Sequence, residues 1–143
     1  MAVLTYGQRK YIEARIRNYY LYKEDIAEWR ETIINGSHRS ESGTRSPRYA
    51  SDPTATTAIR LSNPPKNIRD MELWVEAIDA AHERFKSDDK GKLFEVWYWK
   101  RPQSPYKAAL ALNVSEDTFK LWRRELEIFT ALIAAQKGIF TLV

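Results

Sequence analysis

Residues 105–125 read PYKAALALNVSEDTFKLWRRE, and they are the most informative segment of the sequence. We expect a short helix to begin here, with Ser104 as its N-cap and Pro105 at its first position. The helix should end at Asn113, because Asn tolerates a left-handed backbone best after Gly. Ser115 then caps a second helix. The pattern therefore predicts two helices joined by a tight turn.

The apolar residues of this stretch fit a helix-turn-helix, which we predict over residues 104–126. Ala109 is small at the point where the second helix should cross the first closely. The side chains expected to point inward are Ala108, Leu112, Val114, Phe119, Trp122, Leu126, Phe129 and Ile133. A short helix, a turn and an amphipathic helix also occur in ordinary core packing, so the pattern leaves both interpretations open. The second helix should continue to about Lys137, before Gly138.

The inward set leaves a polar side of the same two helices facing outward. The candidate DNA-binding residues are Lys107, Ser115, Glu116, Asp117, Lys120, Leu121 and Arg124, with Thr118 and Arg123 at the margins. Polar residues in the first turn can meet base edges, while Lys120, Arg123 and Arg124 can meet phosphates or guanine. The acidic pair Glu116 and Asp117 counts against this function, because carboxylates repel phosphate, although they can accept a hydrogen bond from cytosine.

The segments before this stretch also have helical periodicity. Apolar residues recur at steps of three and four at Ile68, Met71, Val75, Ile78, His82 and Phe85, with Trp74 and Ala81 beside them. They predict a central amphipathic helix whose seam packs against another helix, in the same chain or in a second copy. Residues 92–100 predict a short helix with Leu93, Phe94, Val96 and Trp97 inward. Residues 61–89 carry four Lys or Arg and seven Asp or Glu, whereas residues 90–127 carry eight and five. The segment with the candidate site is therefore the basic one.

The N-terminal part predicts one long helix followed by a linker. Apolar side chains recur at helical spacing from Ile12 to Ile33, and Asn35-Gly36 predicts the helix end. Residues 36–66 are rich in Ser, Thr, Arg and Pro, which is typical of a partly disordered linker. Within it, Ser51 or Asp52 could cap a short helix that begins at Pro53. No segment has strand periodicity, so the fold class is all-α.

These elements give three predicted regions: residues 1–35 as an N-terminal helix and candidate oligomerisation element, residues 36–66 as the linker, and residues 67–143 as a helical DNA-binding domain. A chain of 143 residues with 43% hydrophobic residues suits one domain, and a net charge of +4 permits nucleic-acid binding without establishing it. The absence of cysteine excludes disulfides and thiolate metal sites and fits a reducing compartment.

Several function classes have no support in the sequence. We find no phosphate-cradling glycine loop, no nucleophile–base arrangement and no metal-ligand spacing, so no enzyme, cofactor or metal is expected. The N-terminus has no apolar segment typical of a secretory signal, and no apolar run approaches the length that spans a bilayer. We therefore expect a cytoplasmic protein with no membrane partner.

Five segments of the chain form an ordered set: Ser51-Asp52-Pro53-Thr54 with Ala58-Ile59, then Trp74 to Ile78, Leu93 to Trp99, Asn113 to Phe119, and Leu121 to Glu125. In these segments the chain resembles the RinA-like phage transcriptional activators. The resemblance implies an activator of the late packaging and morphogenesis genes of phages or prophages of Gram-positive bacteria. It also implies a C-terminal module similar to region 4 of sigma factors, with residues 115–124 as recognition helix and 104–112 as supporting helix. Residues 103–107 depart from the family pattern.

The resulting expectation is a sequence-specific DNA-binding transcriptional activator in the cytoplasm of a bacterial host. Its expected partners are double-stranded DNA, the host RNA polymerase and a second copy of the chain. Two alternatives stay open. One is a DNA-packaging component of the small-terminase type, because such proteins also join a helix-turn-helix to helical oligomerisation segments. The other is a helical protein–protein adaptor whose aromatic faces bind a partner protein.

Overall fold

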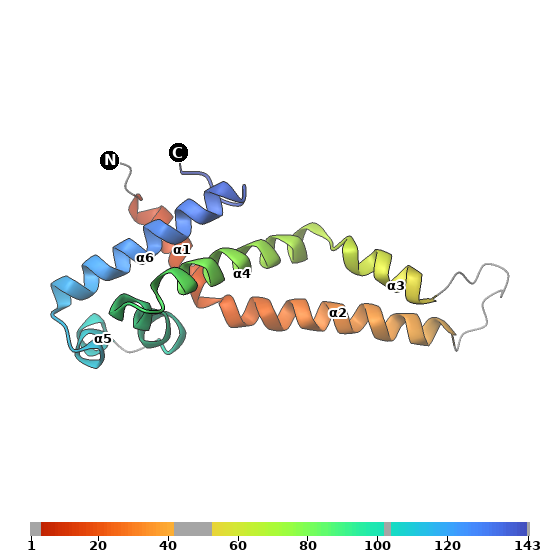
Figure 1. The fold of residues 1–143 in the computed structure, drawn as a ribbon, viewed down its shortest axis with the longest axis horizontal. Coiled ribbons are helices and arrows are strands. Elements are labelled where there is room, and N and C mark those ends of the chain that lie inside the picture. The colour runs from red at the N-terminus through yellow and green to blue at the C-terminus, as the bar shows by residue number, and fades with distance from the viewer. Residues whose placement is uncertain (1–3, 42–52, 102–103, 143) are drawn as a thin grey trace. The chain divides into compact units, whose positions relative to one another are not determined.

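A computed structural model of the protein describes residues 4–41, 53–101 and 104–142, and every regular element in these ranges is helical (Figure 1), which confirms the all-α class. The elements are α1 (Tyr6–Arg17), α2 (Tyr19–Glu41), α3 (Pro53–Ser62), α4 (Lys66–Phe85), the 3₁₀ turn η2 (Asp89–Gly91), the π-helix η3 (Phe94–Trp99), α5 (Pro105–Leu112) and α6 (Glu116–Gln136). Contacts divide the chain into two compact units, Met1–Tyr20 with Leu73–Val143, and Leu21–Glu72. None of the helices in the described ranges is both long and apolar enough to cross a bilayer.

The unit Leu21–Glu72 consists of most of α2, the whole of α3 and the beginning of α4. Its buried apolar side chains include Tyr22, Ile33 and Ile68. Arg30 on α2 and Glu72 on α4 form an ion pair at 3.4 Å. Among the described residues of this unit, the buried apolar side chains form only a small core.

The predicted helix end at Asn35-Gly36 is wrong, because α2 continues to Glu41. Gly36 stays in the helix, and Gly138 is the one glycine with a positive φ in the part of the chain that the structure describes. A glycine inside a helix costs only about 1 kcal/mol relative to alanine, so the helix can pass through it. Within the predicted linker, Pro53 begins α3 as expected, while residues 42–52, including both candidate caps, lie outside the described residues.

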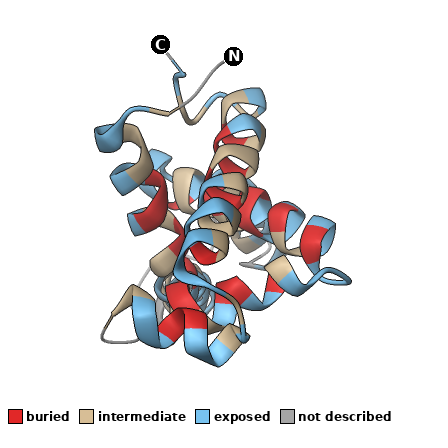
Figure 2. Ribbon diagram, turned by 90° about the vertical axis from the view of Figure 1, so that its left-hand side faces the viewer, coloured by how far each residue is buried: buried red, intermediate tan, exposed pale blue. Residues whose placement is uncertain are grey.

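The other unit holds the main core, to which α1, α4, η3, α5 and α6 each contribute one buried side (Figure 2). The completely buried apolar side chains are Ile12, Ile16, Ala77, Ile78, Ala81, Leu93, Phe94, Tyr98, Phe119, Leu126, Ala108, Ala131 and Ala134. On α4 the buried stripe runs through Trp74, Ala77 and Ala81, while the predicted seam members Met71, Val75 and His82 are only partly buried. The core thus combines large aromatic rings with small alanines, and the small side chains let helices approach closely.

The predicted continuous N-terminal helix is wrong at one residue. Asn18, with φ −88° and ψ 9°, ends α1, and α2 begins at the next residue. Tyr19 is fixed directly after this break: its hydroxyl donates a hydrogen bond of 2.5 Å to Asp79, and its ring stacks on Trp99 with centroids 5.1 Å apart. The spacing of apolar residues continues through the break, and no Gly or Pro marks it in the sequence. The break coincides instead with the long-range contacts of Tyr19.

Two local features shape the chain between α4 and α5. Gly91 lies so close to the end of α4 that a Cβ atom would stand 2.3 Å from the carbonyl oxygen of Phe85, so only glycine fits there. The predicted helix over residues 92–100 takes the wider π form in η3, with Leu93, Phe94 and Trp97 buried as expected. Arg17 donates hydrogen bonds to two carbonyl oxygens near its end, those of Trp97 (3.1 Å) and Tyr98 (3.4 Å).

Candidate nucleic-acid interface

Helix α5 and its turn form as the sequence predicts. The Ser104 side chain accepts a hydrogen bond of 3.2 Å from the N–H of Lys107, and Pro105 occupies the first helical position. Asn113 adopts the left-handed conformation, with φ 60° and ψ 43°. The N–H groups of Asn113 and Val114 donate to the carbonyls of Leu110 and Ala109, each at 3.0 Å. These two bonds are a Schellman motif, which satisfies the free carbonyls at the helix end.

Helix α6 also begins and ends close to the predicted residues. The Ser115 side chain accepts a hydrogen bond of 3.1 Å from the N–H of Thr118, which makes Ser115 the N-cap. The helix ends at Gln136, with Lys137 as C-cap, and Gly138 follows with φ +80°. The two capped helices are joined by a turn of three residues, 113–115, of which only Asn113 is left-handed, so the connection is short and hydrogen-bonded.

The inner side of α5 and α6 packs on η3. Ala108, Ala109 and Phe119 are buried, and the ring of Trp97 meets Phe119 edge to face with centroids 5.2 Å apart. Trp122 is only partly buried, although the sequence predicts it as a second core anchor beside Phe119. Leu112 and Val114, also predicted inward, are partly buried. Phe119 is therefore the principal anchor of this end of α6.

The outer side of the same two helices gathers most of the candidate DNA-binding residues. The exposed candidates are Lys107, Ser115, Glu116, Asp117, Lys120, Leu121 and Arg124, and Thr118 is half-buried beside them. Lys120 and Arg124 are one helical turn apart and so share a face. Neither forms an ion pair with any residue that the structure describes. We call Asp117, Lys120, Leu121 and Arg124 the outer row of α6.

Arg123 is the exception among the candidates. Its side chain is only 18% exposed, and its Nε lies 3.7 Å from a carboxylate oxygen of Glu127. Its guanidinium lies over the rings of Trp97 and Phe119, at 5.3 and 5.8 Å from their centroids. Successive residues of a helix are rotated by about 100°, which turns Arg123 toward the core and Arg124 toward solvent. Arg123 is thus separated from the outer row.

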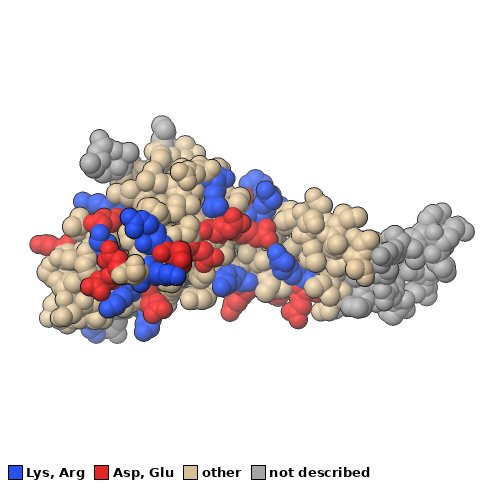
Figure 3. All heavy atoms as spheres, in the orientation of Figure 1, with Lys and Arg blue, Asp and Glu red and all other residues tan. Residues whose placement is uncertain are grey.

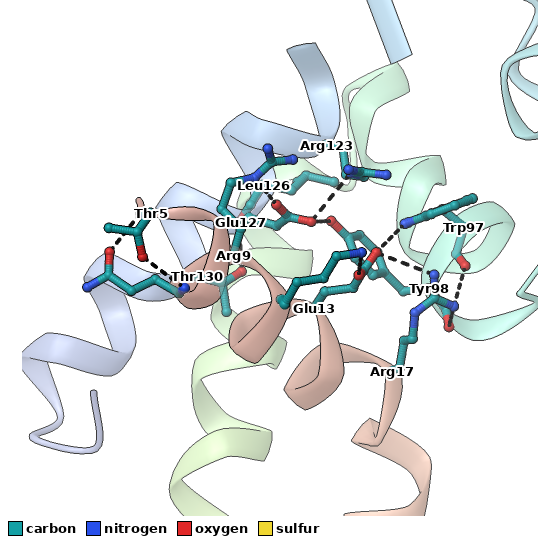
Figure 4. A network of polar contacts seen from close by, with 12 residues as sticks. Thr5, Arg9, Glu13, Arg17, Trp97, Tyr98, Arg123, Leu126, Glu127 and Thr130 are labelled. Atoms are coloured by element: carbon teal, nitrogen blue, oxygen red, sulfur yellow. Dashed lines mark hydrogen bonds and ion pairs between the residues drawn. The ribbon is translucent and has the colours of Figure 1, made fainter. Parts of the chain in front are cut away.

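A buried polar network joins α1, η3 and α6 behind this face (Figure 4). Glu127 is 1% exposed; it accepts hydrogen bonds from Arg9 Nε at 3.0 Å and from the Tyr98 hydroxyl at 2.8 Å. Burial raises the pKa of Glu127, and the hydrogen bonds from Arg9 and Tyr98 only partly offset this effect. The same burial, together with the nearby Glu127 carboxylate, raises the pKa of Tyr98 well above its ordinary value.

Glu13 is the second carboxylate of the network and behaves differently. It accepts a hydrogen bond of 2.9 Å from Trp97 Nε1, and Lys10 and Arg17 lie within 3.3 and 3.4 Å of it. Burial acts to raise its pKa, but the Trp97 hydrogen bond and the surrounding cations outweigh burial, so the pKa of Glu13 is lowered. No sequence motif marks this network, because its partners lie far apart along the chain.

The charge on the visible surface is mixed. Figure 3 shows Lys and Arg interspersed with Asp and Glu around α5 and α6, so the visible face carries no continuous basic strip. Four large apolar side chains are also exposed on these two helices, Tyr106, Leu110, Leu121 and Leu132, the last of them in the second half of α6. The candidate interface therefore combines a few cations with polar and apolar groups, and any attraction for phosphate is local to residues such as Lys120 and Arg124.

The described residues contain no group of three or more His, Asp or Glu side chains arranged to hold a metal ion. Comparisons of the chain with protein-family models, with curated proteins and with solved structures find no match.

Proposed function

We propose that this protein binds double-stranded DNA in a sequence-specific manner, with α6 as the recognition helix and α5 as the supporting helix of a helix-turn-helix. The observation that carries the proposal is the outer row of α6, held outward on a helix whose start, turn and inner side are all fixed. A recognition helix needs this rigidity, because the base contacts of its side chains depend on the helix angle in the major groove.

The residues of the outer side then divide between base edges and the DNA backbone. Ser115, Glu116 and Asp117 lie in the first turn, where recognition helices contact bases. Lys120 and Arg124 supply the positive charge for phosphate or guanine, and Lys107 on α5 is placed for a backbone contact. Arg123, which is turned toward the core, contributes indirectly by holding α6 in place.

The biological role that we propose is activation of late phage or prophage genes, supported by the resemblance to the RinA-like activators. In this role the protein would also contact the host RNA polymerase and would act as a dimer. The acidic side of α4 and the N-terminal helices are the candidate surfaces for these contacts. Solution scattering that finds a monomer at high protein concentration would remove the dimer from the proposal.

The test of DNA binding is selection of bound fragments from the source genome at low salt, followed by footprinting. We expect a small set of fragments to be retained and protected over a defined site. Binding should weaken steeply as salt rises, because phosphates neutralised by Lys and Arg release counterions. Failure to retain any fragment at low salt would contradict the proposal.

One observation favours a second candidate function, a protein–protein adaptor. Tyr106, Leu110 and Leu121 are exposed on the same two helices that carry the outer row. Exposed apolar side chains that gather near each other often mark a protein-binding surface. Under this alternative, Leu110→Ser and Leu121→Ser would abolish partner binding, and Lys120→Ala would have little effect on it. If the protein binds DNA instead, Lys120→Ala should weaken binding and Leu110→Ser should have little effect on it.

A further inference from the structure

A cleft lies beside the outer row of α6, at the beginning of α1. It has a volume of about 290 Å³ and is lined by Leu4, Tyr6, Arg9 and Arg124. Arg124 belongs to the outer row, one turn beyond Lys120, so the cleft continues the proposed DNA-binding face rather than opening elsewhere. Tyr6 is 75% exposed and forms the rim from the α1 side. The first turn of α1 therefore adds its own side chains next to α6.

The charge around this cleft is not balanced. In the network behind it, two carboxylates, Glu13 and Glu127, are paired with four cations, Arg9, Lys10, Arg17 and Arg123. Arg124 adds a fifth cation at the cleft itself, without an ion pair among the described residues. An excess of positive charge around a concave site attracts an anion, and the low-dielectric walls of a cleft strengthen this attraction.

Arg9 is held in a position suited to an anion. It donates from Nε to the buried Glu127 at 3.0 Å, while its two terminal nitrogens make no hydrogen bond with the described part of the chain. A guanidinium fixed through one nitrogen loses little further entropy when its terminal nitrogens bind a phosphate in the fork geometry. Arg124 lines the same cleft from α6, and Tyr6 can donate from its hydroxyl.

We infer that the cleft between Tyr6, Arg9 and Arg124 binds a phosphate of the DNA backbone, so that α1 forms a second contact with the duplex bound by α6. This inference rests on the proposed function and extends it. The phosphate would lie next to the bases facing the outer row, because Arg124 belongs to both surfaces. Lys120 and Arg124 are separated by about 6 Å along the helix axis, which keeps both contacts on one short segment of DNA.

The test measures the affinity of the full chain for duplex DNA at several salt concentrations. Arg9→Gln should make the slope of log K against log salt less steep by up to about 0.9, the value for one neutralised phosphate, because Arg124 still contacts that phosphate. Lys92→Gln is the matched control: it also removes one positive charge, from a side chain that is 70% exposed, pairs with Asp89 and does not line the cleft. We expect Lys92→Gln to change the slope much less.

A second variant, Arg9→Lys, keeps the test valid if Arg9→Gln does not fold. Arg9→Lys keeps a positive charge for Glu127 but lacks the guanidinium fork, so it should keep the melting temperature and still weaken DNA binding. Arg9→Gln combined with Arg124→Gln should weaken binding by less than the product of the two single effects, because both residues act on one phosphate.

The possible outcomes separate this inference from the proposed function. If Lys120→Ala weakens DNA binding while Arg9→Lys and Arg9→Gln bind as the wild type does, the inference is wrong and the DNA-binding face stands. Equal effects of Arg9→Gln and Lys92→Gln would also overturn it, because they would indicate a diffuse charge effect. Absence of DNA binding by the wild type at low salt overturns both. Tight binding of inorganic phosphate that duplex DNA does not displace would assign the cleft to a free anion and contradict the inference.

Discussion

Arg123 and Arg124 are adjacent and chemically identical, yet they belong to different parts of the molecule. Arg123 lies over Trp97 and Phe119 and faces the buried Glu127, whereas Arg124 faces solvent at the end of the outer row. The same division runs along the whole first half of α6, with Phe119 inward and Lys120 outward.

The comparison shows that residue type does not distinguish a DNA-contacting arginine from a structural one. The angular position of an arginine around the helix determines whether it faces the core or solvent. In α6 the buried Phe119 sets the orientation of the helix and therefore these positions. A substitution on the inner side should therefore change the free energy of unfolding, and one on the outer side should change DNA affinity.

The largest difference in the free energy of unfolding is expected between Phe119→Ala and Leu121→Ala. Phe119 is fully buried, so its truncation should lower the free energy of unfolding by about 3–5 kcal/mol. Leu121 is exposed, and its truncation should change that free energy by about 0.5 kcal/mol or less. Urea unfolding followed by tryptophan fluorescence measures both. A similar loss in the two variants would mean that α6 is oriented differently.

Arg123→Ala and Arg124→Ala separate the two sides with a single residue type. Arg123→Ala removes a cation from the buried Glu127 and should cost about 1–3 kcal/mol of stability. Arg124→Ala should leave stability nearly unchanged and should weaken DNA binding. Unfolding and DNA titration of both variants in one buffer are the measurements. Strong loss of DNA affinity in a fully folded Arg123→Ala variant would break the separation.

The turn between α5 and α6 can be tested at Asn113. Its φ of 60° favours Gly and penalises residues with a Cβ atom and no local hydrogen bond. We expect Asn113→Ala to lower stability by about 1 kcal/mol and Asn113→Gly to be neutral or slightly stabilising. Thermal unfolding of the two variants measures the difference. Equal stability of the Ala and Gly variants would contradict the left-handed turn.

The smallest effects should appear in the pH dependence of stability. Because the pKa of Glu127 is raised in the folded protein, its protonated side chain adds to the free energy of unfolding below the ordinary carboxyl pKa. This added stability is lost as the pH rises through the folded-state pKa. Because the pKa of Glu13 is lowered in the folded protein, its ionised side chain adds to the free energy of unfolding above the ordinary carboxyl pKa. This added stability is lost as the pH falls through the folded-state pKa. The two carboxylates of one network should therefore have opposite pH slopes.

Glu127→Gln and Glu13→Gln isolate these slopes. As pH rises from acid to neutral, the wild type should lose stability relative to Glu127→Gln and should gain stability relative to Glu13→Gln. Denaturant unfolding of the three proteins across this pH range is the measurement. If the stability difference from the wild type changes with pH in the same direction for both variants, burial is not the main influence on the pKa of Glu127.

The features that the sequence predicts well are local ones. Ser104, Asn113, Ser115 and Gly138 act through bonds to residues only a few positions away, and all four occupy the predicted places. The same holds for the exposure of Lys120 and Arg124, because the spacing of apolar residues determines which side of a helix is buried.

The features that the sequence does not predict depend on distant partners. Asn18 ends α1 where Tyr19 meets Asp79 and Trp99, none of which is near in sequence. Arg123 turns inward because the rings of η3 and the carboxylate of Glu127 lie there. The cleft beside Arg124 requires α1, which is more than a hundred residues away along the chain. Periodicity within one segment carries no information about such contacts.

Two double variants, compared side by side, show whether the outer row of α6 binds DNA. Lys120→Ala with Arg124→Ala removes two charges from the outer row. The control, Lys66→Ala with Lys86→Ala, removes two charges from the first residue of α4 and the residue directly after its end, whose side chains are 89% and 60% exposed. We predict that the first pair weakens binding to a selected duplex and lowers its salt slope by up to about 1.8, while the control binds nearly as the wild type does. Equal affinity of the two double variants, both folded, would contradict the account.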